Sequence, residues 1–157
     1  QYTLTSLTAR DYIAHQLNAT LNIPVFTLTG TVDTAAPVVD MASVVWLSEP
    51  TLDNSVNRTI KMQVRVTDDV SGIAVLMASV TSPDGRFSVT LGNGTRRLLS
   101  GTTTDGVWEL TGTVPAYSPL GQYTLTSLTA RDYIAHQLNA TLNIPVFTLT
   151  GTVVVSG

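Results

Sequence analysis

Residues 58–69 read RTIKMQVRVTDD, and apolar side chains occupy every second position from Ile60 to Val66. One side of the stretch carries the apolar residues Ile60, Met62, Val64 and Val66. A period of two is typical of a strand that buries one face, usually in an antiparallel sheet. The two aspartates that follow indicate a turn, because their side chains bond readily to the nearby backbone.

The rest of the chain follows the same pattern. The stretch GVWELTGTVP places Trp108, Leu110 and Val114 on one face, and turn residues recur between short apolar runs. The chain is 43% hydrophobic and only 12% charged, and Thr, Val, Leu and Ser suit strands better than surface helices. We therefore expect an all-β fold of seven to nine short strands, an antiparallel Greek-key immunoglobulin-like β-sandwich.

One segment occurs twice. Residues 1–32 reappear letter for letter as residues 122–153, an offset of 121 residues that has the size of a whole domain. The simplest interpretation is a tandem repeat: 1–32 is the C-terminal hairpin of a preceding identical repeat, 33–153 is a complete domain, and 154–157 starts the following segment. The alternative is an engineered chain or a swapped subunit that carries an extra copy of its own edge.

The duplicated segment reads as a hairpin with an irregularity. Tyr123 and Leu125 share one face, whereas Leu128 and Ala130 fall on the other, so we expect a bulge near Ser127. We expect these core residues: Met62, Val64, Val66, Val75, Trp108, Leu110, Tyr123 and Leu125.

Two local features refine the strands. Pro145 cannot donate to a ladder, so the last strand is an edge strand or is kinked there. The stretch GNGTRR superficially suggests a phosphate loop, but no helix pattern follows it, and we expect a hairpin turn between two short strands.

Several motifs together resemble the immunoglobulin-like tandem repeats of large bacterial surface and secreted proteins, of adhesin or stalk type. In chain order they are VDTAAPVV, VRVTDDVSGIA, TSPDG, SGTTTDGVWELTGTVP and LGQYTLTSLTARD. The resemblance covers most of residues 33–153. It implies an extracellular or cell-surface location, and related repeats often use calcium at domain junctions.

Four aspartates are candidate metal ligands. In an immunoglobulin-like sandwich the linker with Asp33, the loop with Asp68 and Asp69, and the loop at Asp132 lie at one end, where they could supply oxygen ligands to calcium. The alternative is that Asp68, Asp69 and Ser71 form an Asx-type turn and that Asp132 caps the next turn.

Other chemistry finds little support in the sequence. There is no cysteine and no catalytic motif. Each repeat has one histidine, His136 in the complete domain, which we interpret as a loop residue. We therefore expect no enzyme. The net charge of −3 predicts no nucleic-acid partner, no apolar run is long enough to predict a membrane span in this fragment, and we expect targeting elements to lie outside it.

Surface features leave two further hypotheses. Four Asn-x-Thr sequons are candidate glycosylation sites: Asn18, Asn57, Asn93 and Asn139. Trp46, Trp108 and Tyr117 could form a sugar-stacking platform, but Trp108 is in phase with Leu110, which favours the core.

Three functions fit these expectations. The first is a structural module of a rod-like stalk or filament built head to tail, because Pro37 and a four-residue linker restrict how domains swing. The second is an adhesin module that recognises glycan or protein through end loops, and the third is an accessory domain of a secreted hydrolase. We also expect residues 1–32 to be ordered by packing against an identical repeat or another chain, by strand donation, where they occupy the place of residues 122–153.

Overall fold

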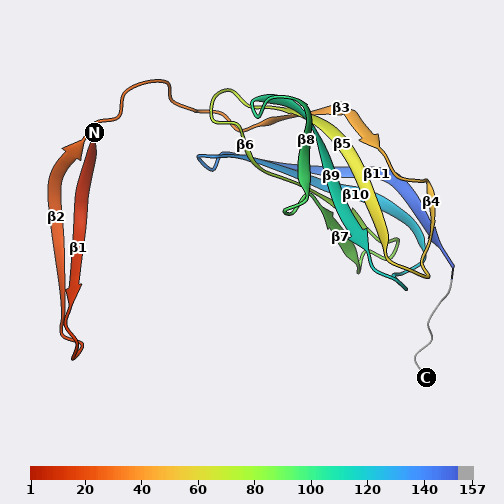
Figure 1. Ribbon diagram of the computed structural model, residues 1–157, viewed down its shortest axis with the longest axis horizontal. Helices are drawn as coiled ribbons and strands as arrows, with labels where there is room; N and C mark the ends of the chain where they lie inside the picture. The colour runs from red at the N-terminus through yellow and green to blue at the C-terminus, as the bar shows by residue number, and fades with distance from the viewer. Residues whose placement is uncertain (152–157) are drawn as a thin grey trace. The chain divides into compact units, whose positions relative to one another are not determined.

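The chain folds as two units in a computed structural model that describes residues 1–151 (Figure 1). The first unit is Gln1–Val32 and the second begins at Asp33. Residues 154–157, which we assign to a following segment, lie outside the described residues, as do the last two residues of the second copy.

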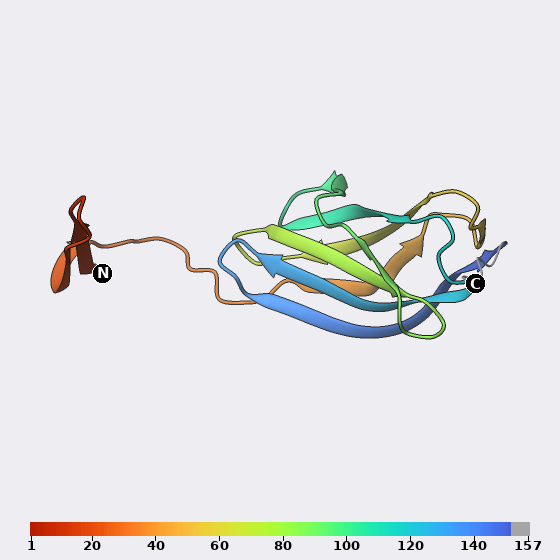
Figure 2. The same cartoon turned by 90° about the horizontal axis from the view of Figure 1, so that it is seen from below.

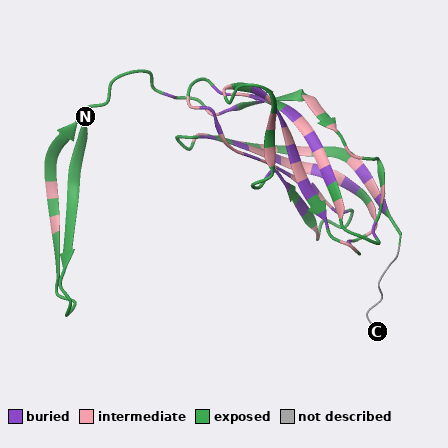
Figure 3. Cartoon of the chain, viewed as in Figure 1, coloured by how far each residue is buried: buried purple, intermediate pink, exposed green. Residues whose placement is uncertain are grey.

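The first unit is a two-stranded hairpin. β1 (Tyr2–Arg10) pairs antiparallel with β2 (Gln16–Phe26). Nearly all of its residues are exposed, and in Figure 3 it is green apart from short intermediate segments on β2.

The second unit contains two sheets in a β-sandwich-like arrangement. The four-stranded sheet has the order β3-β5-β9-β8, and the five-stranded sheet has the order β4-β11-β10-β6-β7. The bounds of the first sheet are β3 (Val38–Trp46), β5 (Arg58–Thr67), β8 (Arg96–Gly101) and β9 (Asp105–Val114). Those of the second are β4 (Thr51–Asp53), β6 (Ile73–Thr81), β7 (Ser88–Leu91), β10 (Gly121–Asp132) and β11 (Gln137–Thr150).

The alternation that predicts β5 is confirmed. All four apolar side chains of its inner face are fully buried, and buried and more exposed residues alternate along β9 in the same way (Figure 3). On β9 the inner face carries Trp108, Leu110 and Val114, as predicted. Both sheets contribute to one apolar core, so hydrophobic burial between them holds the domain together.

The second copy of the duplicated segment forms β10 and β11, and the expected bulge is present. The pairing register shifts between Leu125 and Ser127, which turns Leu128 back toward the core that Leu125 faces. A second shift lies opposite Pro145. Along β11 only residues 148–150 pair with β4, so the part of the strand that contains Pro145 is both irregular and an edge of the sheet.

Two sequence predictions are wrong. Val75 is only partly buried, because the register of β6 is irregular near its start and Leu76 faces the core instead. The GNG turn is not a hairpin turn: β7 pairs with β6 and β8 pairs with β9, so the turn crosses between sheets. Gly92 has a φ of 88°, and a Cβ there would lie 2.4 Å from the carbonyl oxygen of Leu76. The crossover therefore needs glycine.

The chain enters and leaves the second unit at opposite ends (Figure 2). At the entry, Asp33 lies beside the β10–β11 turn, where its Oδ1 is 3.6 Å from Nδ1 of His136. At the exit, the carbonyl oxygen of Thr150 accepts a hydrogen bond from the backbone of Asn54 at 2.8 Å. The full length of β11 separates these two places.

Candidate metal site

The entry end brings the predicted aspartates together in two overlapping groups. Asp33 precedes β3, Asp68 and Asp69 follow β5, and Asp132 is the last residue of β10. In one group carboxylate oxygens of Asp33, Asp68 and Asp69 all lie within 4.8 Å of one another. In the other, carboxylate oxygens of Asp33 and Asp132 and a ring nitrogen of His136 lie within the same 4.8 Å of one another. The four predicted ligands thus share one end, with Asp33 as the common member.

Two carboxylate oxygens in the first group are buried without a hydrogen-bond partner among the described residues. Asp33 accepts the backbone N–H of Ser71 through Oδ2 at 2.8 Å, and Asp68 accepts that of Gly72 through Oδ2 at 2.6 Å. The Oδ1 atoms of both aspartates are buried and accept no hydrogen bond, although Oδ1 of Asp33 lies 3.6 Å from Nδ1 of His136. A buried, unpaired carboxylate oxygen costs free energy, so this arrangement favours a bound cation.

Asp33 and Asp69 each change the ionisation of the other. Hydrogen bonds from Ser71 lower the pKa of Asp33 to about 2. The pKa of Asp69 is raised, chiefly by its hydrogen bond with the Asp33 carboxylate and further by burial and by the negative charges of Asp33 and Asp68. In the absence of a cation the pair holds a proton more readily than an isolated aspartate does, and a cation between the two would replace that proton.

Both carboxylate oxygens of Asp132 form contacts within its own turn. Its Oδ1 accepts the backbone N–H groups of Ile134 and His136, both at 2.9 Å, and its Oδ2 lies 2.8 Å from Nδ1 of His136. Ala135 takes a φ of 74° to close the turn. The hydrogen bond from His136 to Asp132 raises the pKa of His136, and the negative charges of Asp132, Asp33 and Asp69 raise it further. The turn therefore places a readily protonated imidazole beside Asp33.

The donor set of the first group fits calcium. Calcium prefers six to eight oxygen ligands, whereas imidazole suits transition metals. Asp33, Asp68 and Asp69 offer only oxygen, and the His136 nitrogen of the second group is already bonded to Asp132. Three carboxylates would hold the ion, and water would complete its coordination. The sequence did not identify His136 as a member of this cluster; its spacing of four from Asp132 is the signal that could have done so.

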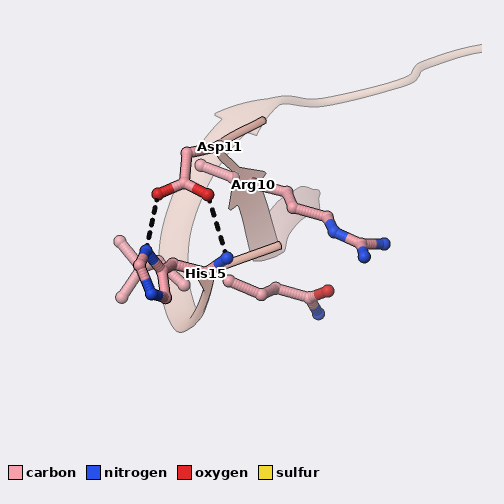
Figure 4. Close-up of a pocket in the computed structure, with 6 residues that line it drawn as sticks. Arg10, Asp11 and His15 are labelled. Carbon is pink, nitrogen blue, oxygen red and sulfur yellow. Dashed lines mark hydrogen bonds and ion pairs between the residues drawn. The ribbon is translucent and has the colours of Figure 1, made fainter. Parts of the chain in front are cut away.

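The first unit, residues 1–32, is called the free hairpin below. It contains the same turn without the surrounding aspartates. Asp11 accepts the backbone N–H of His15 at 2.9 Å through Oδ1, and its Oδ2 lies 2.9 Å from the His15 ring (Figure 4). The turn is thus a local property of the sequence. Beside it lies an open hollow of about 450 Å³ whose lining includes Ala9 and Leu17. The counterpart of Ala9, Ala130, is fully buried in the second unit, so the hollow is part of an uncovered packing face.

The other candidate residues are spread over the surface and the core. All four sequon asparagines are exposed: Asn18, Asn57, Asn93 and Asn139. Trp108 is buried, and Trp46 stacks on Phe147 with ring centroids 5.5 Å apart, whereas Tyr117 is exposed. The three aromatic residues therefore do not form the exposed platform that sugar stacking requires.

No protein-family model matches the chain, and no curated protein matches it either. Within residues 1–151 no helix is long and apolar enough to cross a membrane.

Proposed function

We propose that this chain is an extracellular structural module whose immunoglobulin-like domains join head to tail into a rod-like stalk or filament. The strand orders β3-β5-β9-β8 and β4-β11-β10-β6-β7 support a Greek-key immunoglobulin-like topology, with β4 as a short strand parallel to β11. The hydroxyl of Tyr123, near the start of β10, donates to the carbonyl of Pro119 at 2.9 Å. A tyrosine bonded in this way is a hallmark of immunoglobulin-like sandwiches.

The observation that carries the proposal is the placement of entry and exit. The domain begins at Asp33 at one end and its last strand finishes at Thr150 at the other, and residues 1–32 repeat the segment that ends there. If another domain follows residue 153 in the way that Asp33 follows residue 32, that domain starts at the exit end of the preceding domain. Consecutive domains then add length, and a linker that ends in Pro37 restricts their swing.

We further propose that a calcium ion held by Asp33, Asp68 and Asp69 stiffens this junction. Asp33 is the first residue of the domain, and its Oδ2 accepts the backbone N–H of Ser71 in the loop after β5. An ion shared with Asp68 and Asp69 would bind the start of the domain to that loop. The buried Oδ1 atoms of Asp33 and Asp68, which accept no hydrogen bond among the described residues, support this role.

Small-angle X-ray scattering on a chain extended by one 121-residue repeat tests the proposal. β11 has 14 residues, so each added domain should lengthen the particle by about 45 Å at about 3.3 Å per residue. An added repeat that leaves the maximum dimension unchanged would contradict head-to-tail stacking.

A second candidate function, an adhesin module, is favoured by one observation. The β10–β11 turn exposes Tyr133 and Ile134, which are 65% and 52% accessible. Large apolar side chains at a loop tip suit recognition of a glycan or protein. If this turn binds a ligand, then Tyr133→Ser in the complete domain abolishes binding to cell-surface glycan or protein arrays and leaves the melting temperature unchanged. Equal binding by the intact domain and by Tyr133→Ser would rule out this turn as a binding site.

A further inference from the structure

The free hairpin has the conformation that its copy adopts inside the domain. β1 and β2 pair with the same register as β10 and β11, with register shifts at the same positions. The turns match as well, since Ala14 has a φ of 70° and Ala135 a φ of 74°. A segment already held in its bound conformation loses little entropy when it docks.

The free hairpin exposes the face and the edge that the domain covers in the copy. Tyr2 is 52% exposed, whereas Tyr123 is fully buried, and the other inner residues change in the same sense. β10 pairs with β6 along eight residue pairs, whereas β1 pairs only with β2 within the described residues. In the domain Thr148–Thr150 are part of β11 and pair with β4, whereas their counterparts, residues 27–29, lie outside β2.

We propose that residues 1–32 are a strand donor that completes the domain body, residues 33–121, of a second copy of this chain. β1 adds antiparallel beside β6 of that copy, and residues 27–29 extend β2 along its β4. This inference deepens the proposed function, because the same docking completes each domain of the tandem array. The occupant follows from the structure: the identical residues 122–153 already fill this place.

The donation must occur between chains. To fill the place in its own domain, Thr29 would have to reach the position of Thr150, at the end opposite Asp33. That span is about 45 Å, because β11 has 14 residues at about 3.3 Å each. The four peptide units from Thr29 to Asp33 reach only about 14 Å when fully extended. The chain therefore cannot complete itself with its first hairpin.

The number of hairpins sets the condition for donation. Each chain carries two hairpins of identical sequence and one body, so assembly of intact chains leaves one hairpin per chain without a body. Exchange between intact copies gains no contacts. The acceptor is therefore a copy whose own residues 122–153 have left the body or are disabled.

Matched substitutions in the two hairpins provide the test. The full-length variant Leu4→Asp, Leu7→Asp, Leu125→Asp, Leu128→Asp has two disabled hairpins and serves as a tagged acceptor. The intact chain is the donor, and a chain with only Leu4→Asp and Leu7→Asp is the control donor. Each mixture is refolded together from urea, captured through the tag, and examined by light scattering.

The expected result is a one-to-one complex of acceptor and intact chain, with about twice the 16.7 kDa mass of one chain. Trp46 of the acceptor should regain the fluorescence of the folded domain, because Trp46 stacks on Phe147 and would stack on Phe26 of the donor. The control donor should give no complex. Equal capture of both donors, or of neither, would overturn the proposal.

A disulfide then checks the register, since the chain has no cysteine of its own. Thr129 faces Met77 across β10 and β6, so Thr8→Cys in the donor should cross-link to Met77→Cys in the acceptor. Ser79→Cys, which pairs with Ser127, is the out-of-register control. Cross-linking to position 79 rather than 77 would also overturn the proposal. Failure here would leave the scattering test of repeat length unaffected, so the two ideas fail separately.

Discussion

The ring of Tyr123 stacks on the ring of Phe147 with 4.7 Å between centroids, inside the core. The identical pair, Tyr2 and Phe26, stacks at 4.8 Å in the free hairpin, where both rings are half exposed. The stacking is therefore intrinsic to the hairpin, whereas the burial comes from the domain body. This difference allows the same substitution to be compared in two environments within one chain.

Tyr123→Ala should destabilise the domain by about 3–5 kcal/mol, because it leaves a cavity in the core and removes the hydrogen bond to Pro119. Tyr2→Ala, its matched control, should change the free energy of unfolding by less than about 0.5 kcal/mol. Urea unfolding followed by tryptophan fluorescence measures both, since the two tryptophans lie in the domain. Equal losses in the two variants would mean that the hairpins are energetically equivalent in this chain.

Trp108→Ala should also cost about 3–5 kcal/mol, because the indole is buried on β9 across from Val64 of β5, and the guanidinium of Arg96 lies over its ring at 5.6 Å from the ring centre. Calorimetry or urea unfolding gives the value. A loss below about 1 kcal/mol would mean that the ring contributes little to the core and would restore Trp108 as a surface for ligands.

Calcium should raise the melting temperature of the chain, and EDTA should lower it. Binding to the folded state contributes about 2.7 kcal/mol when the free ion is at 100 times its dissociation constant. Asp69→Asn should abolish the response to calcium, whereas Asp40→Asn, outside the cluster, should preserve it. In EDTA, Asp69→Asn should have a higher free energy of unfolding than the intact chain at neutral pH. The reason is that the raised pKa of Asp69 means that its ionised form is disfavoured in the folded state. A midpoint that is the same in EDTA and in millimolar calcium would remove the metal site.

In metal-free buffer, stability should fall as the pH rises above about 6.5. The folded state raises the pKa of His136 through its bond to Asp132, so the protonated imidazole stabilises the domain below the unfolded value and this contribution is lost as the pH passes the folded value. His136→Gln should remove this part of the pH dependence, and His15→Gln, in the free hairpin, should retain it. The same slope in both variants would assign the effect to other groups.

The sequence predicts the strands better than their pairing. Alternation identified β5 and β9, and the change of face within the duplicated segment located the bulge at Ser127. Periodicity carries no information on which strand a segment pairs with, so it does not predict that the GNG turn crosses between sheets. The prediction that Val75 lies in the core is wrong because an irregular register cannot be read from alternation alone.

For the candidate site, the sandwich topology predicts that the loops of Asp33, Asp68 and Asp132 lie together, and the structure places them at one end. The contribution of His136 depends on a turn that requires a positive φ at Ala135, a residue that rarely adopts one. The residue types alone do not indicate this backbone conformation. The buried carboxylate oxygens that accept no hydrogen bond likewise follow from packing rather than from sequence.

The central claim, that consecutive domains stack end to end, is tested most directly by a distance between equivalent points in two neighbouring domains. Thr90 is exposed on β7, and with no cysteine in the chain, Thr90→Cys in each of two consecutive repeats accepts spin labels at two defined sites. Double electron–electron resonance should give a narrow distribution centred at about 45 Å, the length of the 14-residue β11 at about 3.3 Å per residue. A distribution centred well below that length, or one spread broadly in saturating calcium, would contradict the stalk.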